Sequence, residues 1–410
     1  MVSSGRAERG RSIKGITRRD FVRGSVAATA ALALPAGVSA ERRRYRVAVI
    51  GRTGRGNYGH GLDVVWNEIE QAEVVAVADE NPQGRAAAAK RLKIASSYAD
   101  HREMLARERP EIVSVAPRWI DCHRDMALAC AEAGTHVFLE KPMCRTLREA
   151  DEIVAAFEKK NLKLAIAHQR RYSPTMKIIL EIIAEGKLGD LLELRARGKE
   201  DKRGAAFDMM CLGTHTMDLM HLVAGDAQWC FAEVRQGGKA ITREHIRQGI
   251  EGYGPIAGDE INATYRFGGV AMGYFSSHRA RHGVSERWGL RLYGSKGIIT
   301  IGQGGDRPRT SWFIEDPTWQ PGRSKAKWQQ ITSAGVGKTE PIKDVESHEL
   351  GNRLIALDLI RAIETDTQPK GSMYDGRAAM EMIMAVYESH RMGRPVPLPL
   401  KNRDHPLALL

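Results

Sequence analysis

Short apolar runs alternate with helical patterns over the first part of the chain. Strand-like apolar runs occupy 45–50, 73–78, 112–116 and 136–139, and the first of them is rich in β-branched residues. Between them, apolar positions recur at helical spacing in 62–69, 83–92 and 122–133. Strands that alternate with helices of about ten residues predict parallel β-α-β units. The fold class predicted for residues 41–167 is therefore α/β, with the sheet of a Rossmann dinucleotide-binding domain.

The pattern changes at about residue 168. Apolar and polar positions alternate in 261–267, 270–275 and 288–293, which is typical of antiparallel strands. Helical spacing returns in 350–363 and 378–390. Residues 303–346 are rich in Gly, Pro, Ser, Thr and Lys, and we expect a long excursion between strands or an arm that contacts a partner. We predict a second, α+β domain over residues 168–410.

A glycine-rich segment follows the first strand. Gly54, Gly56 and Gly59 have the spacing of a dinucleotide fingerprint, while Gly51 directly ends the strand. Glycines allow a tight turn and a close approach of backbone N–H groups to a pyrophosphate at a helix N-terminus. The loop is longer than the usual turn, so the sequence leaves open which glycines contact phosphate. Asp79 ends the second strand and is expected to bind the ribose hydroxyls, which favours NAD over NADP.

The first 40 residues have the order of an export signal. A basic segment precedes a weakly apolar, alanine-rich stretch that ends in Val38-Ser39-Ala40. The pair Arg18-Arg19, followed by Phe21, resembles the twin-arginine export motif. That route resembles one for proteins that are already folded, often around a cofactor. We therefore expect residues 1–40 to be a twin-arginine signal peptide, and the mature protein to work in the periplasm or cell envelope, with the export machinery as a partner.

Charge and cysteine content exclude several classes of function. The formal net charge of the 410 residues is +12, and residues 1–40 contribute +5 of it. No basic helix interleaved with aromatic residues and no zinc-finger spacing is present, so nucleic acid is not expected as a partner. The five cysteines form no C-x-x-C pair, and no metal site is expected. No apolar run reaches the length of a membrane-spanning helix.

Several short motifs occur in a characteristic order. The fourth strand ends in Glu140-Lys141-Pro142, and Ala116-Pro117 precedes a helix that carries His123. Arg171-Tyr172-Ser173-Pro174, Gly213-Thr214-His215 with Asp218, and Leu292–Gly297 follow further along the chain. Together these resemble the glucose–fructose oxidoreductase, inositol dehydrogenase and rhizopine catabolism (Gfo/Idh/MocA) family over nearly the whole chain after residue 40.

The resemblance implies a fold and a set of site residues. The second domain would contain a large, mostly antiparallel open sheet and would often mediate homo-oligomerisation. Lys141 would be the catalytic acid/base beside the nicotinamide, and His215 would bind the reacting oxygen or share the proton. A lysine base needs a pKa lowered by burial or nearby positive charge. The cofactor would further contact Ala116, Pro117, Trp119, His123 and Glu140, and the substrate would contact Arg171, Tyr172, Lys199 and His215.

One position departs from the family pattern. Dehydrogenases of the family carry an Asp four residues before the histidine, where this chain has Cys211. The nearest acid is Asp208, seven residues before His215. Either Asp208 reaches the site from an altered turn and joins the catalytic set, or the site uses a different proton relay.

Three functions remain open. The first is an NAD(P)-dependent oxidoreductase acting on a hydroxyl or ketone of a sugar, cyclitol or sugar derivative, with NAD the expected cofactor. The second is a glycoside hydrolase or lyase that holds its NAD tightly and works by transient oxidation and elimination. The third is a noncatalytic protein that binds a dinucleotide; Cys211 motivates it, whereas Lys141 and His215 argue against it.

Overall fold

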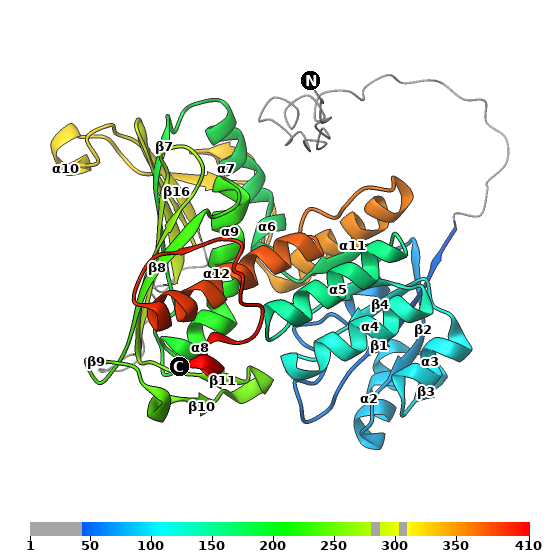
Figure 1. Ribbon diagram of the computed structural model, residues 1–410. Helices are drawn as coiled ribbons and strands as arrows, with labels where there is room; N and C mark the ends of the chain where they lie inside the picture. Colours follow the sequence, from blue (N-terminus) through cyan, green and yellow to red (C-terminus); the bar gives the residue numbers. More distant parts are fainter. Residues whose placement is uncertain (1–42, 280–287, 303–309) are drawn as a thin grey trace, which may run out of the picture. The chain divides into compact units, whose positions relative to one another are not determined.

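The first sheet of the computed structural model is parallel and has six strands (Figure 1). The structure describes residues 43–279, 288–302 and 310–410. The strand order is β3-β2-β1-β4-β5-β6. The bounds are β1 (Tyr45–Ile50), β2 (Ala72–Ala78), β3 (Ser96–Tyr98), β4 (Ile112–Val115), β5 (His136–Leu139) and β6 (Leu164–Ile166). The predicted Rossmann sheet is confirmed, and the strand order changes direction between β1 and β4, where open α/β sheets bind ligands.

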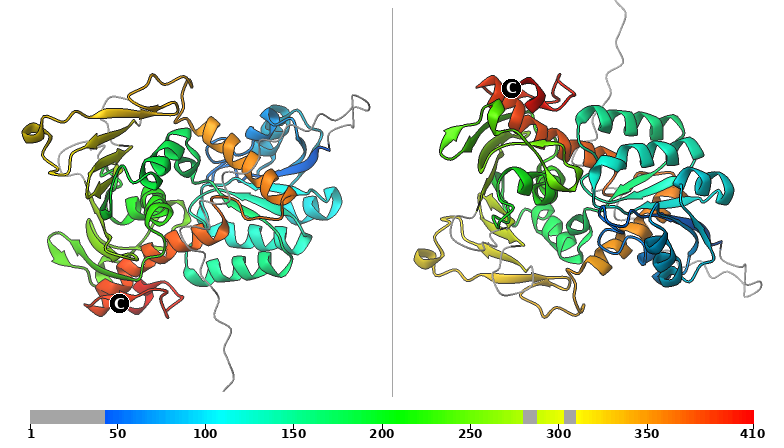
Figure 2. Two further views of the ribbon diagram at one scale, coloured as in Figure 1. Left: turned by 90° about the horizontal axis from the view of Figure 1, so that it is seen from above. Right: turned by 90° about the horizontal axis from the view of Figure 1, so that it is seen from below.

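Helices cover both faces of this sheet. Ala48 and Ile50 of β1 share a core with α3 (His101–Glu108), α4 (His123–Ala133) and α5 (Leu147–Lys159). Val47 and Val49 point the other way and share a core with η1 (Val65–Glu68), α2 (Pro82–Leu92) and α11 (His348–Glu364). Helix α11 comes from the segment predicted as the second domain (Figure 2). The boundary at residue 168 therefore separates the strands of the two sheets, but the core of the first domain includes residues from beyond it.

The helix expected over 62–69 is wrong. A single 3₁₀ turn, η1, stands in its place, after a succession of turns. Gly54, Gly56, Gly59 and Gly61 have φ between +63° and +90°, and Asn57 has φ of +52°. A right-handed helix needs a negative φ at each residue, so none can run through 54–61, and the chain is still in turns where the predicted helix would begin.

Over the described residues, the second sheet has eleven strands and is mostly antiparallel. Its order is β18-β17-β16-β15-β14-β7-β13-β12-β8-β19, with β9 beside β8. The strands at its centre are β14 (Gly289–Gly294), β7 (Leu191–Arg197), β13 (Met272–His278), β12 (Glu260–Arg266) and β8 (Trp229–Gln236). Strand β13 pairs with β7 in parallel. The other bounds are β9 (Lys239–Ala240), β15 (Gly297–Ile301), β16 (Ser311–Glu315), β17 (Gln329–Thr332), β18 (Gly335–Val336) and β19 (Val396–Pro397).

The interpretation of residues 303–346 as an excursion is corrected where the structure describes them. Strands β16, β17 and β18 extend the edge of the large sheet, with the short α10 (Pro321–Ser324) between β16 and β17. Paired backbone groups thus continue the hydrogen-bonded ladder. A small hairpin, β10 (Arg247–Gln248) and β11 (Pro255–Ile256), lies outside this sheet and encloses the 3₁₀ turn η5 (Ile250–Gly252).

Helices of the second segment lie on the large sheet and reach the first one. After α6 (Gln169–Tyr172) and α7 (Pro174–Ala184), a nearly continuous helical run comprises α8 (Ala206–Asp208), the π-helix η3 (Met209–Gly213) and α9 (Thr214–Ala224). Helix α12 (Met373–Met392) packs against β8, α9 and α5, and so contacts both domains (Figures 1 and 2). The remaining 3₁₀ turns are η2 (Ile120–Cys122), η4 (Arg243–His245) and η6 (Pro406–Leu409).

Two further features concern the cysteines and the hydropathy of the helices. All five cysteines are buried and none is paired in a disulfide. Among the described residues, no helix has the length and hydropathy needed to cross a membrane.

Candidate active site

Lys141 lies two residues after the end of β5 and points at the π-helix of the second domain. Its Nζ lies 3.4 Å from the backbone oxygen of Cys211, one turn before His215. A π-helix inserts an extra residue into a helical turn and often marks a functional site. Lys141 and His215 are 7% and 8% exposed, so the predicted pair lies nearly out of water between the two domains.

The surroundings push the pKa values of the pair apart. Burial lowers the pKa of Lys141, but Cys211, Glu140 and Glu251 outweigh it and hold the pKa above the usual 10.5. Burial also lowers the pKa of His215 well below 6.5, and the charge of Lys141 adds to the effect. At neutral pH, Lys141 is a charged hydrogen-bond donor and His215 is a neutral imidazole. The lowered lysine pKa expected for a lysine base is therefore wrong for the cofactor-free protein.

Asp208 does not reach this pair. Its carboxylate accepts hydrogen bonds from the Ser277 hydroxyl at 2.7 Å and from the Glu200 N–H at 3.2 Å. Burial raises its pKa. The helical run that begins at α8 turns Asp208 toward strand β13 and the backbone of Cys211 toward Lys141, so we remove Asp208 from the catalytic set.

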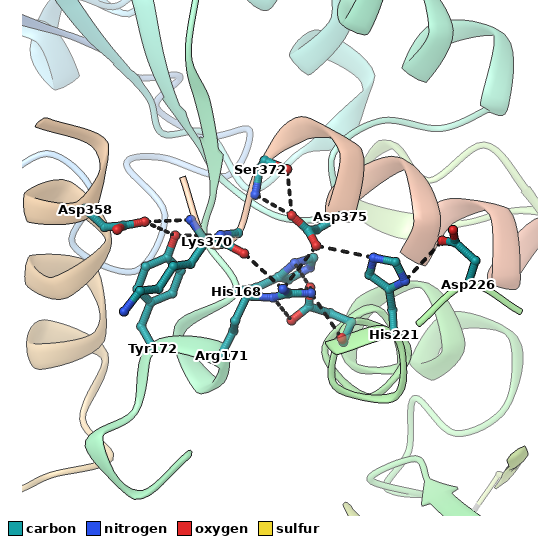
Figure 3. Close-up of polar contacts among 11 residues, drawn as sticks. His168, Arg171, Tyr172, His221, Asp226, Asp358, Lys370, Ser372 and Asp375 are labelled. Carbon is teal, nitrogen blue, oxygen red and sulfur yellow. Dashed lines mark hydrogen bonds and ion pairs between the residues drawn. The ribbon is translucent and has the colours of Figure 1, made fainter. Parts of the chain in front are cut away.

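A buried network of charges surrounds His168 and Arg171 (Figure 3), and His168 in turn packs against the His215 ring. His168 lies edge-on to the His215 ring, with centroids 5.5 Å apart, and its Nδ1 is 3.1 Å from Asp218. The Asp218 carboxylate also pairs with Arg171 at 2.8 Å. Within the described part of the chain, His215 Nδ1 has no hydrogen-bond partner. The network thus holds the ring while leaving one nitrogen for another molecule.

The same contacts correct two predicted substrate residues. Arg171 lies between Asp218 and Asp375, and also donates to the backbone oxygen of Lys370 at 2.9 Å (Figure 3). The Tyr172 hydroxyl donates to Asp358 at 3.0 Å. Both side chains are buried and satisfied inside the protein, so we place neither in a substrate pocket.

Other charged groups lie closer to the pair. The electrostatic neighbours of Lys141 include Arg118 and Glu251 as well as Glu140. Glu251 sits in η5 with φ of +58°, and the next residue, Gly252, packs against Asp121 of the first domain. Lys199 and Arg203 both face Asp201, at 3.9 Å and 2.7 Å. Lys199 remains a predicted substrate contact, on the loop before α8.

Sequence reasoning missed His168 and Glu251. His168 precedes the Arg171 motif by three residues, and Asp218 lies one helical turn after His215. This spacing could have indicated part of the network. Glu251 carried no such signal, because tertiary folding alone brings the hairpin loop to the first domain.

The predicted cofactor residues gather at the carboxyl edge of the first sheet. Ala116, Pro117 and Trp119 follow β4, and Glu140 and Lys141 follow β5. His123 lies 2.7 Å and 2.8 Å from the backbone oxygens of Pro117 and Pro142, so it ties these two segments together rather than facing outward. An acid after β2 and a glycine-rich turn at the ends of β1 and β4 are the features that a dinucleotide site needs, and the residue types present fit one.

The segment 51–61, called the glycine loop below, packs on these residues. A Cβ at Gly56 would lie 2.4 Å from the Arg118 nitrogen, and one at Gly59 would lie 2.6 Å from the Ala116 oxygen. These glycines permit close packing of the loop on the strand ends. A Cβ at Gly54 would meet nothing within 4 Å, but the Gly54 N–H donates to the Asn57 side-chain oxygen at 2.9 Å and so is not available to a phosphate in this conformation.

Comparison with known proteins defines the class. Residues 45–168 match the family model described as "Oxidoreductase family, NAD-binding Rossmann fold", and residues 181–398 match its C-terminal alpha/beta domain. The chain belongs to the Gfo/Idh/MocA family of oxidoreductases, whose first domain is an NAD-binding Rossmann domain.

Individual relatives are distant. D-apiose dehydrogenase of Paraburkholderia graminis is 26% identical over 89% of this chain and 92% of its own length. Levoglucosan dehydrogenase of Pseudarthrobacter phenanthrenivorans is 27% identical over 55% of this chain and 64% of its own length. A glycosyl hydrolase family 109 protein of Shewanella amazonensis is 30% identical over 43% of this chain and 45% of its own length. A levoglucosan dehydrogenase structure with NADH and levoglucosan has a TM-score of 0.70 at 21% identity, covering 87% of this chain and all of that one.

Proposed function

We propose that the protein is an NAD-dependent dehydrogenase for a hydroxyl group of a sugar, cyclitol or sugar derivative. One observation carries the proposal: a charged Lys141 and a neutral His215 lie together at the cofactor edge of the Rossmann sheet. Two groups whose surroundings push their pKa values apart are the usual mark of an acid and base pair. The relatives named for sugars support the substrate class.

Each side chain has one task in this scheme. The neutral His215 accepts the hydroxyl proton through its free Nδ1, and the Lys141 ammonium stabilises the negative charge that develops on the oxygen. A bound NAD supplies the acceptor for the hydride. In the opposite direction, Lys141 stabilises the same oxygen as a carbonyl is reduced. Glu140 and Glu251 keep Lys141 charged throughout.

The experiment combines turnover with two lysine variants. Residues 41–410 are incubated with NAD and a panel of sugars, cyclitols and sugar acids, and NADH is followed by its absorbance. Lys141→Met should retain NAD binding and lose about 10²- to 10⁴-fold in kcat, because the charge on the reacting oxygen is no longer stabilised. Lys159→Met, at the exposed end of α5, is the matched control and should keep the wild-type rate. Wild-type turnover in Lys141→Met would contradict the assignment.

A second candidate is redox-neutral cleavage of a glycoside with retained NAD. The match to a glycosyl hydrolase family 109 protein favours it, and the same Lys141 and His215 would serve. Release of a free sugar from a glycoside without net NADH formation would select this function. Binding of NAD and sugar without either change would select the noncatalytic alternative.

We further propose that residues 1–40 direct twin-arginine export and that the chain is loaded with NAD beforehand. These residues lie outside the described part of the chain, so the sequence alone supports the proposal. Intact-mass analysis of the protein isolated from the cell envelope should give an N-terminus near Glu41, and denaturation should release NAD near one equivalent. A chain that keeps residues 1–40 in the cytoplasm would contradict it.

A further inference from the structure

The carboxylate predicted to bind ribose already has a full set of donors. Asp79 accepts hydrogen bonds from the Thr53 hydroxyl at 2.7 Å, the Tyr58 hydroxyl at 2.8 Å, and the N–H groups of Thr53 and Asn81, each at 3.0 Å. A carboxylate offers about four lone-pair positions to donors. Asp79 is also only 2% exposed. The ribose hydroxyls therefore have no position left at Asp79 in this conformation.

The second carboxylate of the cofactor edge is held in the same way. Glu140, fully buried, pairs with His60 Nδ1 at 2.5 Å and accepts a hydrogen bond from the Lys141 N–H. His60 and Tyr58 belong to the same glycine loop. Asp79 directly follows β2 and Glu140 directly follows β5, and β1 and β4 lie between these two strands in the sheet. The loop thus spans the crevice at the strand ends, which is the path of a dinucleotide in this fold.

The Tyr58 ring packs against Gly51, on the turn that is expected to approach the pyrophosphate. A Cβ at Gly51 would lie 2.1 Å from the Tyr58 ring, so the ring packs directly on the end of β1. The Arg91 guanidinium covers the ring, with its carbon 4.8 Å from the centroid, and pairs with Asp63. Burial and the hydrogen bond to Asp79 raise the pKa of the phenol far above its usual value, so it remains a donor.

We propose that Tyr58 sets the affinity of the cofactor site, because its phenol takes the place of a ribose hydroxyl at Asp79. The glycine loop must move before the dinucleotide binds. Gly54, Gly56, Gly59 and Gly61 all have positive φ, which glycine adopts and leaves without a steric penalty, so they can serve as pivots. Binding to a form that is only partly populated raises the apparent Kd by the reciprocal of its population. The proposal rests on the proposed function only in requiring that this edge bind NAD.

The test removes the phenol and keeps the ring. Tyr58→Phe in residues 41–410 should lower the Kd for NAD about tenfold and speed association, because the closed loop loses one hydrogen bond to a charged group. Titration calorimetry and stopped-flow fluorescence measure the two quantities. Tyr374→Phe is the matched control, since it removes a 2.8 Å phenol–carboxylate bond between α12 and Glu158 of α5, and it should leave both quantities unchanged.

Hydrogen exchange reports the motion itself. In the wild-type protein, the N–H groups of Thr53 and Asn57 are bonded to Asp79 and Arg52, and saturating NAD should make them exchange faster if the loop leaves its seat. Slower or unchanged exchange would contradict the movement.

The binding results separate this proposal from the proposed function. Equal NAD affinity for the wild type and Tyr58→Phe overturns the proposed role of Tyr58. Weaker binding by the variant also overturns it, because Tyr58 would then be a contact of the cofactor and not its competitor. Failure of both proteins to bind NAD overturns it as well. If the variant binds NAD equally well or more weakly, the proposed dehydrogenase function is still supported by turnover in the wild type and its loss in Lys141→Met, because those measurements do not depend on Tyr58.

Discussion

At the scale of single residues, the protonation states of Lys141 and His215 fix the pH dependence of the reaction. His215 is neutral above its lowered pKa and becomes charged only as the pH falls well below 6.5. Lys141 keeps its proton until the pH rises above 10.5. With NAD as the varied substrate, kcat/KM reports on the cofactor-free protein and should be flat from about pH 7 to about pH 10.

A lysine base with a lowered pKa would give a different profile. Its kcat/KM would rise as the pH increased through that lowered pKa, about tenfold per unit below it, because only the neutral amine accepts a proton. A rising profile between pH 7 and 9 would therefore remove His215 as the proton acceptor and return that role to Lys141.

The sequence predicted some of these residues well and others badly, for physical reasons. Lys141 and His215 were found because short motifs mark them. Asp208 was misplaced because spacing along the chain does not show which way a π-helix turns each side chain. The role of Tyr58 was not visible, because nothing in a glycine-rich sequence shows where an extended loop will lie. Arg171 belongs to a family motif, but its side chain forms ion pairs inside the protein with Asp218 and Asp375 and does not face a substrate pocket.

At the scale of elements, α9 is held to its neighbours by the Asp218 ion pairs. Burial raises the pKa of Asp218, but Arg171 and His168 outweigh it and hold the pKa below the usual 3.8. Its stabilisation is therefore present above that usual value and is lost as the pH falls. Asp218→Asn should lower the free energy of unfolding by about 3 kcal/mol, because the buried Arg171 then keeps only one of its two carboxylate partners, Asp375. Urea denaturation measures this change.

The control for that variant lies in the same network. Asp226 faces His221 with a side chain that is 89% exposed, so Asp226→Asn should change stability by less than about 0.5 kcal/mol (Figure 3). Equal effects of the two substitutions would show that the buried pairs contribute nothing beyond a surface contact.

Elements were predictable where one physical cause dominates. The strands at 45–50 and 136–139 were predicted to the residue, because each is a short apolar run set off from the helical patterns around it. The helix predicted at 62–69 was wrong because the turns that begin in the glycine-rich segment, with five positive φ values at 54–61, continue through Val64 and leave room for only one 3₁₀ turn. The strands at the edge of the large sheet were missed because Gly, Pro and Ser suggested a loop. Periodicity located α11 but could not show which sheet it covers.

At the scale of the whole molecule, α11 and α12 make the two domains one folding unit. Ile355, Leu359 and Ile360 of α11 complete the core on one face of the Rossmann sheet, and α12 packs on α5 at the other. Residues 41–410 should therefore unfold in one calorimetric transition. The fragment 41–167 lacks both helices and should keep strand and helix content without a cooperative transition, and should bind hydrophobic dyes.

Leu359→Ala tests whether the two domains fold together without removing any part of the chain, as the fragment 41–167 does. The substitution leaves a cavity in the core of the first domain, and such changes cost about 2–5 kcal/mol. If the domains fold together, the single transition should move to lower temperature without splitting, although Leu359 lies nearly two hundred residues beyond β6. Two separate transitions in this variant, or a cooperative melt of the fragment 41–167, would show that the Rossmann domain folds alone and that α11 is an accessory to it.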